Sequence, residues 1–207
     1  HETPDARASA DAARRVVGCP REAVAVMRFA YADPPYLGCA RMYAAHHPEA
    51  MIWDDPETHR RLIERLSDEW PDGWALSLHA PSLQTILAMC PRDVRVGPAC
   101  KTFGQIRPVA VQWMWEPVIW RGGRKGKPNP SPRDWLLYNT APRSAAKDGL
   151  IGGKPRAFCR WVFSLLNAEP GDTLDDLFPG TGAVSAAWQE YTEPRRQRDL
   201  VMRETAA

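Results

Sequence analysis

Short runs of apolar residues alternate along the chain with segments whose apolar residues recur at helical spacing. Residues 21–32 (REAVAVMRFAYA) are nearly all apolar or small and stop just before a pair of prolines. A run of this kind is typical of a strand that is buried on both faces of a parallel sheet. Residues 73–80 (GWALSLHA) form a second such run, and residues 109–120 alternate with the period of two that a strand requires. We therefore predict strands in these three segments and a further one over residues 172–178.

Helical patterns lie between these runs. Asp54 or Asp55 can cap a helix whose first turn holds Pro56. The apolar residues that follow share one face of this helix, and they are Leu62, Ile63, Leu66 and Trp70. Similar patterns predict helices over residues 82–90, 155–168 and 182–191. Strands that alternate with helices in this way predict an α/β fold with a largely parallel sheet.

The composition is that of an ordinary globular protein, with 44% apolar and 25% charged residues among 207. The net charge is only +2, so no strong overall field draws the chain to nucleic acid. The five cysteines form no C-x-x-C pair, which argues against a disulfide framework and favours a reducing cytoplasm. No apolar run approaches the ~18 residues of a membrane span, and the first residues lack the apolar core of a signal peptide. We therefore expect one cytoplasmic domain with no membrane partner.

A glycine-rich turn follows the predicted strand at 172–178, in the stretch LDDLFPGTGAV. Gly180 and Gly182 allow the backbone to approach a ligand closely, and the helix that follows offers free N–H groups. An acid at the end of the strand together with such a turn suits a nucleotide-like ligand. The stretch is not a P-loop, since no G-K-[ST] follows, and it lacks the third glycine of a dinucleotide fingerprint. Many structural turns between a strand and a helix also carry two glycines, so a purely structural role stays open.

The tetrapeptide D-P-P-Y, residues 33–36, directly follows the first predicted strand. Prolines fix φ and remove backbone donors, so the carbonyl groups of Asp33 and Pro34 point where the chain directs them. Asp33 and the carbonyl of Pro34 could accept hydrogen bonds from an exocyclic amine, while Tyr36 offers a flat face for stacking. Two acceptors would favour the pyramidal form of the amine, which can attack a methyl donor in line. A proline-stiffened loop with a surface tyrosine is the alternative interpretation.

Together the two motifs resemble the S-adenosylmethionine-dependent amino-methyltransferases that act on nucleic-acid bases, and most closely the N6-adenine DNA methyltransferases. The resemblance implies that the flipped base is bound, and methyl transfer catalysed, by Asp33, Pro34, Pro35 and Tyr36. It also extends to GKPRAFCRWVF, which is similar to the K-P segment that precedes the family's donor motif. The residues that it implies for binding the methyl donor are Asp33, Lys154, Pro155, Asp176, Phe178, Pro179, Gly180, Thr181 and Gly182.

The resemblance covers residues 21–192 and implies a Rossmann-like methyltransferase fold in a single domain. GWALSLHA resembles the strand after the catalytic loop, and WMWEPVIWRGGRKG resembles the strand pair whose E-P-[IV] segment precedes a variable region. The catalytic motif precedes the donor motif, which is the order of the permuted class. Permutation is compatible with one site, because both motifs need only lie at the carboxyl ends of adjacent central strands. Residues 1–20 are expected to form a tail or short helix, and residues 193–207 a C-terminal tail.

Two departures from the family pattern bear on ligand binding. Beyond the donor motif we identify no acid for the ribose of the donor, so we expect either weak affinity for the donor or a partner that completes the pocket. A homodimer or a partner subunit could also complete the specificity. The segment 121–152 is a short basic loop where sequence-specific members carry a recognition domain. Its cations could contact nucleic-acid phosphates or form a solvated surface, and they are Arg121, Arg124, Lys125, Lys127 and Arg133. We therefore expect a relaxed target, or one that a partner selects.

Two other groups of residues could bind ligands. His46 and His47 lie near Asp54 and Asp55 in the sequence, but adjacent histidines without a spaced third ligand rarely hold a metal. We expect no metal site, and either histidine could instead touch substrate at the mouth of the site. The tryptophans of residues 109–120 suit core packing better than base stacking, and they are Trp113, Trp115 and Trp120.

The expected function is methyl transfer from S-adenosyl-L-methionine to the exocyclic amine of a nucleic-acid base. Adenine N6 is the favoured target, and DNA is favoured over RNA as the substrate. S-P-P-Y is commoner for cytosine N4 and N-P-P-Y for protein glutamine, so Asp33 favours adenine. An N4-cytosine or RNA methyltransferase would keep the same chemistry. A non-catalytic, methyltransferase-shaped subunit that binds nucleic acid or an active partner is the interpretation from a different class.

Overall fold

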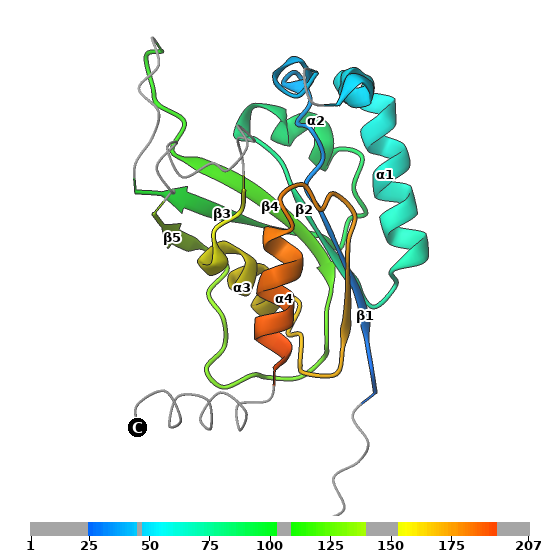
Figure 1. Ribbon diagram of the computed structural model, residues 1–207, viewed down its shortest axis with the longest axis vertical. Coiled ribbons are helices and arrows are strands. Elements are labelled where there is room, and N and C mark those ends of the chain that lie inside the picture. Colours follow the sequence, from blue (N-terminus) through cyan, green and yellow to red (C-terminus); the bar gives the residue numbers. More distant parts are fainter. Residues whose placement is uncertain (1–24, 45–46, 103–108, 140–152, 194–207) are drawn as a thin grey trace, which may run out of the picture.

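The computed structural model describes residues 25–44, 47–102, 109–139 and 153–193 (Figure 1). In these residues one six-stranded sheet has the order β5-β3-β4-β2-β1-β6. Every strand of it points the same way except β4, which is antiparallel to both of its neighbours. The largely parallel sheet predicted from the sequence is confirmed. Its strands are β1 (Arg28–Ala32), β2 (Gly73–Ser77), β3 (Arg95–Lys101), β4 (Trp115–Gly122), β5 (Leu136–Tyr138) and β6 (Thr173–Asp176).

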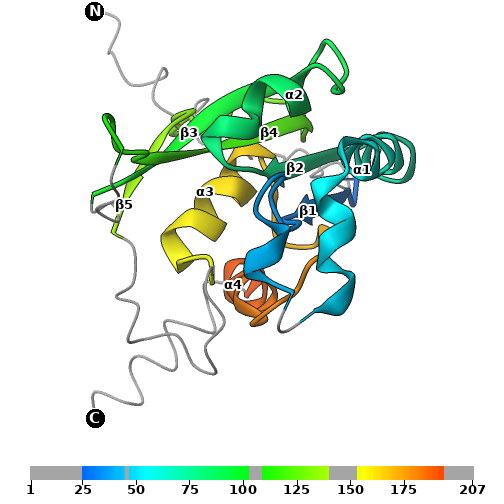
Figure 2. The ribbon, with the colours of Figure 1, turned by 90° about the horizontal axis from the view of Figure 1, so that it is seen from above.

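Helices cover both faces of this sheet, as Figures 1 and 2 show. One face packs against α1 (Pro56–Glu69) and α2 (Leu83–Leu87), and the other against α3 (Arg156–Leu165) and α4 (Ala183–Thr192). The molecule is therefore a three-layer α/β fold. Short 3-10 helices join the layers, and they are η1 (Ala40–Met42), η2 (Pro48–Asp54) and η3 (Ala80–Ser82).

Strand β1 is buried on both faces, as its uninterrupted run of apolar residues predicts. Phe29 and Tyr31 face the core under α3 and α4, whereas Ala30 and Ala32 face the core under α1 and α2. All four side chains are at most 1% exposed. The small alanines leave room for α1, and the aromatic rings fill the wider space on the other side.

Helix α1 follows the local signals of its sequence closely. Asp55 is the N-cap and accepts a hydrogen bond from the backbone N–H of Glu57 at 3.0 Å, with Pro56 in the first turn. The predicted apolar face is confirmed as buried, with His59 added to Leu62, Ile63, Leu66 and Trp70. Asp54, the other candidate cap, instead contacts the loop after β1.

Strands β3 and β5 were not predicted from the sequence, and β3 contains Gly97 and Pro98, which are residue types that usually interrupt strands. A Cβ at Gly97 would lie 2.2 Å from the backbone oxygen of Asp134, so only glycine fits where that segment crosses β3. Pro98 stands opposite Pro117 of β4 in the register, where each proline faces a residue that also lacks a donor. Gly97 and Pro98 therefore fit in β3 because of the residues that lie next to them in the fold.

Several predicted boundaries differ from the structure, among them that of β1, which begins at Arg28 and not at residue 21. Strand β4 begins at Trp115 and not at residue 109, since its register with β3 ends at the pair Cys100–Trp115. Helix α2 is shorter than residues 82–90, because η3 takes its first turn. The segment 121–152 is not all loop, since it contains β5. The predicted N-terminal tail, residues 1–20, lies outside the described residues, and so does the predicted C-terminal tail, residues 193–207, except for Glu193.

The two edges of the sheet carry different loops. Because β1, β2 and β6 are parallel, their carboxyl ends share one edge, which is uppermost in Figure 1. The loop after β4 leaves from the opposite edge, since Gly122 pairs with Gly73 at the start of β2. Among the described strands β6 is an edge strand and β1 lies next to it, so the two strands that carry the motifs are adjacent, as expected, but they are not central. We call the first edge the carboxyl edge and the second the amino edge.

Candidate active site

The two sequence motifs lie side by side at the carboxyl edge. In the register of β1 with β6, Tyr31 is the partner of Asp176. The backbone N–H of Leu177 extends this pairing, donating to the carbonyl of Tyr31 at 3.0 Å. Burial raises the pKa of Asp176, and the negative charge of Asp33 adds to that rise. The D-P-P-Y loop and the glycine-rich turn, about 145 residues apart in the chain, are thus neighbours.

The loop that follows β1 is tied to itself and to η2. The hydroxyl of Tyr36 donates to Oδ1 of Asp33 at 3.1 Å. Oδ1 of Asp54 accepts from the backbone N–H groups of Gly38 at 2.8 Å and Ala40 at 3.1 Å. Asp54, at the end of η2, therefore holds the segment just after Tyr36. No motif in the sequence pointed to this role.

Lys154, the residue before Pro155 at the N-cap of α3, reaches the D-P-P-Y loop with its ammonium group. Nζ lies 3.0 Å from Oδ1 of Asp33 and donates to the hydroxyl of Tyr36 at 2.9 Å. The side chain is only 9% exposed. The lysine expected on the donor side of the site is therefore ion-paired with the expected base-binding aspartate.

Burial and neighbouring charges set the protonation of this cluster. Burial raises the pKa of Asp33, although the adjacent Lys154 opposes the rise. Burial and the carboxylates of Asp33 and Glu116 raise the pKa of Tyr36 well above its ordinary value. Burial alone would lower the pKa of Lys154, but Asp33, Tyr31 and Glu116 raise it well above its ordinary value. Lys154 is therefore a cation at neutral pH, and Tyr36 is uncharged.

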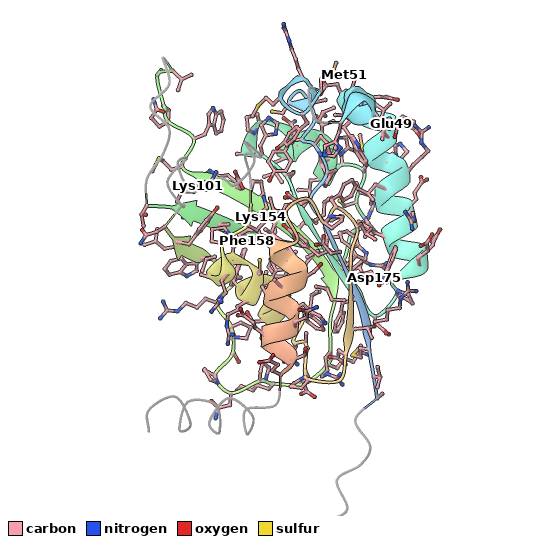
Figure 3. The ribbon with its side chains drawn as sticks, viewed as in Figure 1. Glu49, Met51, Lys101, Lys154, Phe158 and Asp175 are labelled. Atoms are coloured by element: carbon pink, nitrogen blue, oxygen red, sulfur yellow. The ribbon has the colours of Figure 1, made fainter. Side chains whose placement is uncertain are left out.

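Glu116 on β4 was not identified from the sequence as a site residue. Its Oε2 lies 3.7 Å from Nζ of Lys154 and 3.5 Å from the hydroxyl of Tyr36, and its Oε1 is ion-paired with Lys101. Burial would raise the pKa of Glu116, but Lys154 and Lys101 lower it below its ordinary value. Figure 3 labels Lys101 and Lys154, the two lysines that contact this carboxylate. The available signal was the E-P segment itself, whose glutamate lies on an otherwise apolar strand.

His79 also belongs to the site and was missed. Its ring stacks on Tyr36 with centroids 5.7 Å apart and 20° between the planes. Nδ1 is 2.9 Å from Oγ of Ser82, and burial lowers the pKa of the imidazole, so it is neutral at pH 7. The signal was its place just after β2, because the carboxyl ends of β1 and β2 share an edge. One face of the Tyr36 ring is thus covered by His79.

The glycine-rich turn presents open backbone next to these side chains. Gly180 has φ +45° and Gly182 has φ +74°, values that L side chains rarely adopt. A Cβ at Gly182 would meet nothing within 4 Å, and this residue caps α4 without any side-chain hydrogen bond. Asp176 accepts from the backbone N–H of Phe178 and from Oγ of Ser185, each at 3.4 Å. The turn can therefore receive an anionic group at the start of α4 and a cationic group at Asp176.

The other donor-motif residues surround this turn. The ring of Phe178 packs edge-on against Trp53, with centroids 5.1 Å apart, and so joins the core under α1. Pro179 and Thr181 are exposed. A Cβ at Gly153 would lie 3.5 Å from Oγ1 of Thr181, which puts the start of the K-P segment against the turn. In the catalytic motif Pro34 is buried and Pro35 half-buried.

The structure does not bring the basic loop to this site. Arg121 lies in β4 at the amino edge, where its Nε is 2.9 Å from both carboxylate oxygens of Asp93. Arg124 is ion-paired with the buried Asp172 at the start of β6. The remaining cations lie in the segment between β4 and β5, which Figure 1 shows along the bottom of the molecule, and they are Lys125, Lys127 and Arg133. The charges face the opposite edge because β4 is the antiparallel strand.

Other candidates have different outcomes. His46 lies outside the described residues, and His47 is exposed. Within the described residues no group of three or more His, Cys, Asp or Glu side chains could hold a metal ion. In the described part of the chain no helix has the length and apolar character needed to cross a membrane. Of the tryptophans, Trp120 is in the core, Trp115 is half-buried and Trp113 is 57% exposed.

No protein-family model and no curated protein sequence matches this chain. Among solved structures, a similar fold occurs in the crystal structure of the M1.HpyAVI-SAM complex. The two share 15% identity with a TM-score of 0.54, over 81% of this chain and 79% of that chain. At this identity the likeness shows the fold, which is the Rossmann-like methyltransferase fold. The fold class expected from the sequence is therefore confirmed.

Proposed function

We propose that this chain is a SAM-dependent methyltransferase acting on the exocyclic amine of a nucleic-acid base, with adenine N6 in DNA as its substrate. The observation that carries the proposal is the parallel pairing of β1 with β6, since it brings Asp33 beside the turn at residues 178–182. The fold it shares with M1.HpyAVI supports methyltransferase activity in general and SAM as the donor. The choice of adenine rests on Asp33 as the first residue of D-P-P-Y.

The residues of the glycine-rich turn fit SAM. The open backbone at Gly182 and the N–H groups at the start of α4 hold the carboxylate of the donor. Asp176, at the end of β6, accepts from its ammonium group. SAM supplies a methyl group that its sulfonium centre activates for nucleophilic attack. The chain contributes placement, because Asp33 follows β1, the strand that pairs with β6, and so lies next to the donor turn.

The D-P-P-Y loop provides the acceptors for the amine. Lys154 and the hydroxyl of Tyr36 both contact Oδ1 of Asp33, which leaves Oδ2 to accept from the amine, with the carbonyl of Pro34 as the second acceptor in this proposal. The base stacks on the face of the Tyr36 ring opposite His79. As the methyl group is transferred, the amine loses a proton, and Asp33 accepts it. Burial raises the pKa of Asp33 and makes this carboxylate a better proton acceptor.

Transfer of a labelled methyl group from SAM to DNA tests this function, with the methylated nucleoside identified by mass spectrometry. The expected product is N6-methyladenine. In Asp33→Ala the rate should fall by on the order of 10²–10³, as when one group that stabilises a transition state is removed. SAM affinity, measured by calorimetry, should stay near the wild-type value. Asp68→Ala, at an exposed position of α1, is the matched control and should keep full activity.

The rival interpretations give different results in the same assay. Methyl transfer that is unchanged in Asp33→Ala contradicts the assigned role of this residue. N4-methylcytosine as the product, or transfer to RNA in preference to DNA, changes the substrate but keeps the chemistry. If the purified chain does not bind SAM at millimolar concentration, the chain is a methyltransferase-shaped subunit without catalysis.

A further inference from the structure

We propose that Glu116 is a positioning residue for methyl transfer, which shares Lys154 with Asp33 and so leaves Asp33 able to accept hydrogen bonds from the substrate amine. The inference rests on the proposed function and extends it to a residue outside both motifs. Glu116 lies on β4, opposite Ala99 of β3, with its side chain only 19% exposed. A carboxylate with so little contact with water stays ionised only if cations or hydrogen-bond donors stabilise its charge.

Each oxygen of the Glu116 carboxylate has its own partners. Oε1 is ion-paired with Lys101, which comes from the end of β3. Oε2 lies 3.7 Å from Nζ of Lys154 and 3.5 Å from the hydroxyl of Tyr36. Lys101 thus fixes the orientation of the carboxylate, and the other oxygen faces two groups that contact Asp33. Nζ of Lys154 also lies 5.4 Å from the centroid of the Phe158 ring, and both residues are labelled in Figure 3.

The distances show that Lys154 is shared between two carboxylates. Its Nζ is 3.0 Å from Oδ1 of Asp33 and 3.7 Å from Oε2 of Glu116. Coulomb energy falls as the inverse of distance, so in the same surroundings the second attraction is about 80% of the first. Without Glu116 the ammonium would be held by Asp33 alone and would neutralise it. With Glu116 present, two cations balance two carboxylates, and no single pair is isolated.

Sharing the lysine has a consequence for the acceptor geometry. Both contacts of the Asp33 carboxylate with described residues use Oδ1, one from Lys154 and one from Tyr36. Glu116 draws Lys154 and the Tyr36 hydroxyl toward the β4 side of the site. The ammonium is therefore kept from bridging both oxygens of Asp33, and Oδ2 stays available to the amine.

Charged and titratable groups from several elements surround the Asp33 carboxylate and affect its pKa. The charged ones are Lys154 before α3, Glu116 on β4 and Asp176 on β6. Burial lowers the pKa of His79, which stacks on Tyr36, and raises that of the other titratable neighbours, so all of them stay uncharged near pH 7. The neighbours with a raised pKa are Tyr31, Tyr36, Tyr43, Tyr138 and Cys159. Glu116 is thus the neighbour on β4 whose charge a substitution can remove.

The variant Glu116→Gln keeps the shape of the side chain and removes its charge. We expect kcat for methyl transfer to fall by about tenfold, the loss that one charge-assisted hydrogen bond corresponds to. SAM affinity should stay within about twofold, because Glu116 does not contact the donor turn. The acid limb of the pH–rate profile should move to lower pH, since a neighbouring negative charge no longer opposes ionisation of Asp33.

A readout that does not need activity is the exchange of the lysine ammonium protons. The chain has only five lysines, so ¹⁵N-lysine labelling gives few signals, and Lys125 and Lys127 on the far edge serve as references. Loss of Glu116 should speed proton exchange at Lys154 and leave the references unchanged. Glu190→Gln is the matched control, because Glu190 pairs with Arg156 at the start of α3 at 2.6 Å and should affect neither readout.

The outcomes separate this inference from the proposed function. An active wild type with an unchanged kcat and acid limb in Glu116→Gln overturns the positioning role alone. Unchanged exchange at Lys154 overturns it as well. If Glu116→Gln is poorly folded, the variant Lys101→Met replaces it as the test. This variant removes the partner of Oε1 of Glu116 and should also lower kcat. Full activity of Lys101→Met contradicts the proposal. A wild type that transfers no methyl group to any nucleic acid refutes the proposed function itself, and the positioning role with it.

Discussion

Replacing Arg124 by methionine tests whether the basic loop braces the fold or serves as a nucleic-acid contact. Nη2 of Arg124 is ion-paired with Asp172, and the two side chains are only 12% and 1% exposed. Asp172 also accepts from the backbone N–H of Met27 at 2.9 Å and of Glu169 at 2.8 Å. The variant Arg124→Met therefore removes the cation and leaves a buried carboxylate with two amide donors.

The expected cost follows from this geometry. Removing one partner of a buried ion pair lowers the free energy of unfolding by about 3–5 kcal/mol. Because two amide donors still satisfy Asp172, we expect the lower end, about 3 kcal/mol. In a domain of this size such a loss lowers Tm by about 6–12 °C. The effect should reach β1 and β6 together, since Asp172 joins the starts of both strands.

Urea denaturation followed by tryptophan fluorescence measures the change in the free energy of unfolding. The matched control is Lys125→Met, because Lys125 is exposed in the same loop and its loss should cost within about 0.5 kcal/mol. Affinity for DNA, measured at low denaturant, should be the same in both variants. If Arg124→Met is as stable as Lys125→Met and binds DNA more weakly, the assignment of Arg124 as a brace is wrong.

Three further predictions concern the site. Asp54→Ala removes the acceptor of two N–H groups in the loop after Tyr36, so steady-state methyl transfer should slow while calorimetry shows unchanged SAM affinity; a wild-type rate would contradict the role of Asp54. Gly182→Ala forces a Cβ into a residue with φ +74°, which should cost about 1–2 kcal/mol in urea denaturation and weaken SAM binding; full stability would argue against the positive φ. Burial raises the pKa of Asp33, so the rate should fall as the pH drops through a value above the ~4 of an exposed aspartate; an acid limb at or below pH ~4 would refute this.

Local sequence patterns predict much of the fold. The cap at Asp55, Pro56 and the spacing of apolar residues predict α1, because these features act within one helix. The uninterrupted run of apolar and small residues in β1 predicts that this strand is buried on both faces. Strand β3 was missed because the need for glycine at Gly97 comes from Asp134, which is distant in the chain and adjacent only in the fold.

The residues of the site were likewise predicted only where they belong to a local sequence motif. The D-P-P-Y loop and the glycine-rich turn are contiguous motifs, so their residues could be identified before their neighbours were known. Glu116 and His79 could not, since each is a single residue that reaches Tyr36 only through the order of the strands. Arg124 shows the opposite error, because a basic composition predicts a surface contact, whereas the partner of this arginine is Asp172, 48 residues away.

The central claim is that the D-P-P-Y loop and the glycine-rich turn form one ligand site at the carboxyl edge. Hydrogen exchange of the intact chain, measured by mass spectrometry with and without SAM, tests it most directly. We expect SAM to slow exchange in peptides that contain residues 33–36 and residues 177–184, and to leave exchange over residues 121–133 unchanged. Protection confined to the basic loop, or to only one of the two motifs, would contradict it.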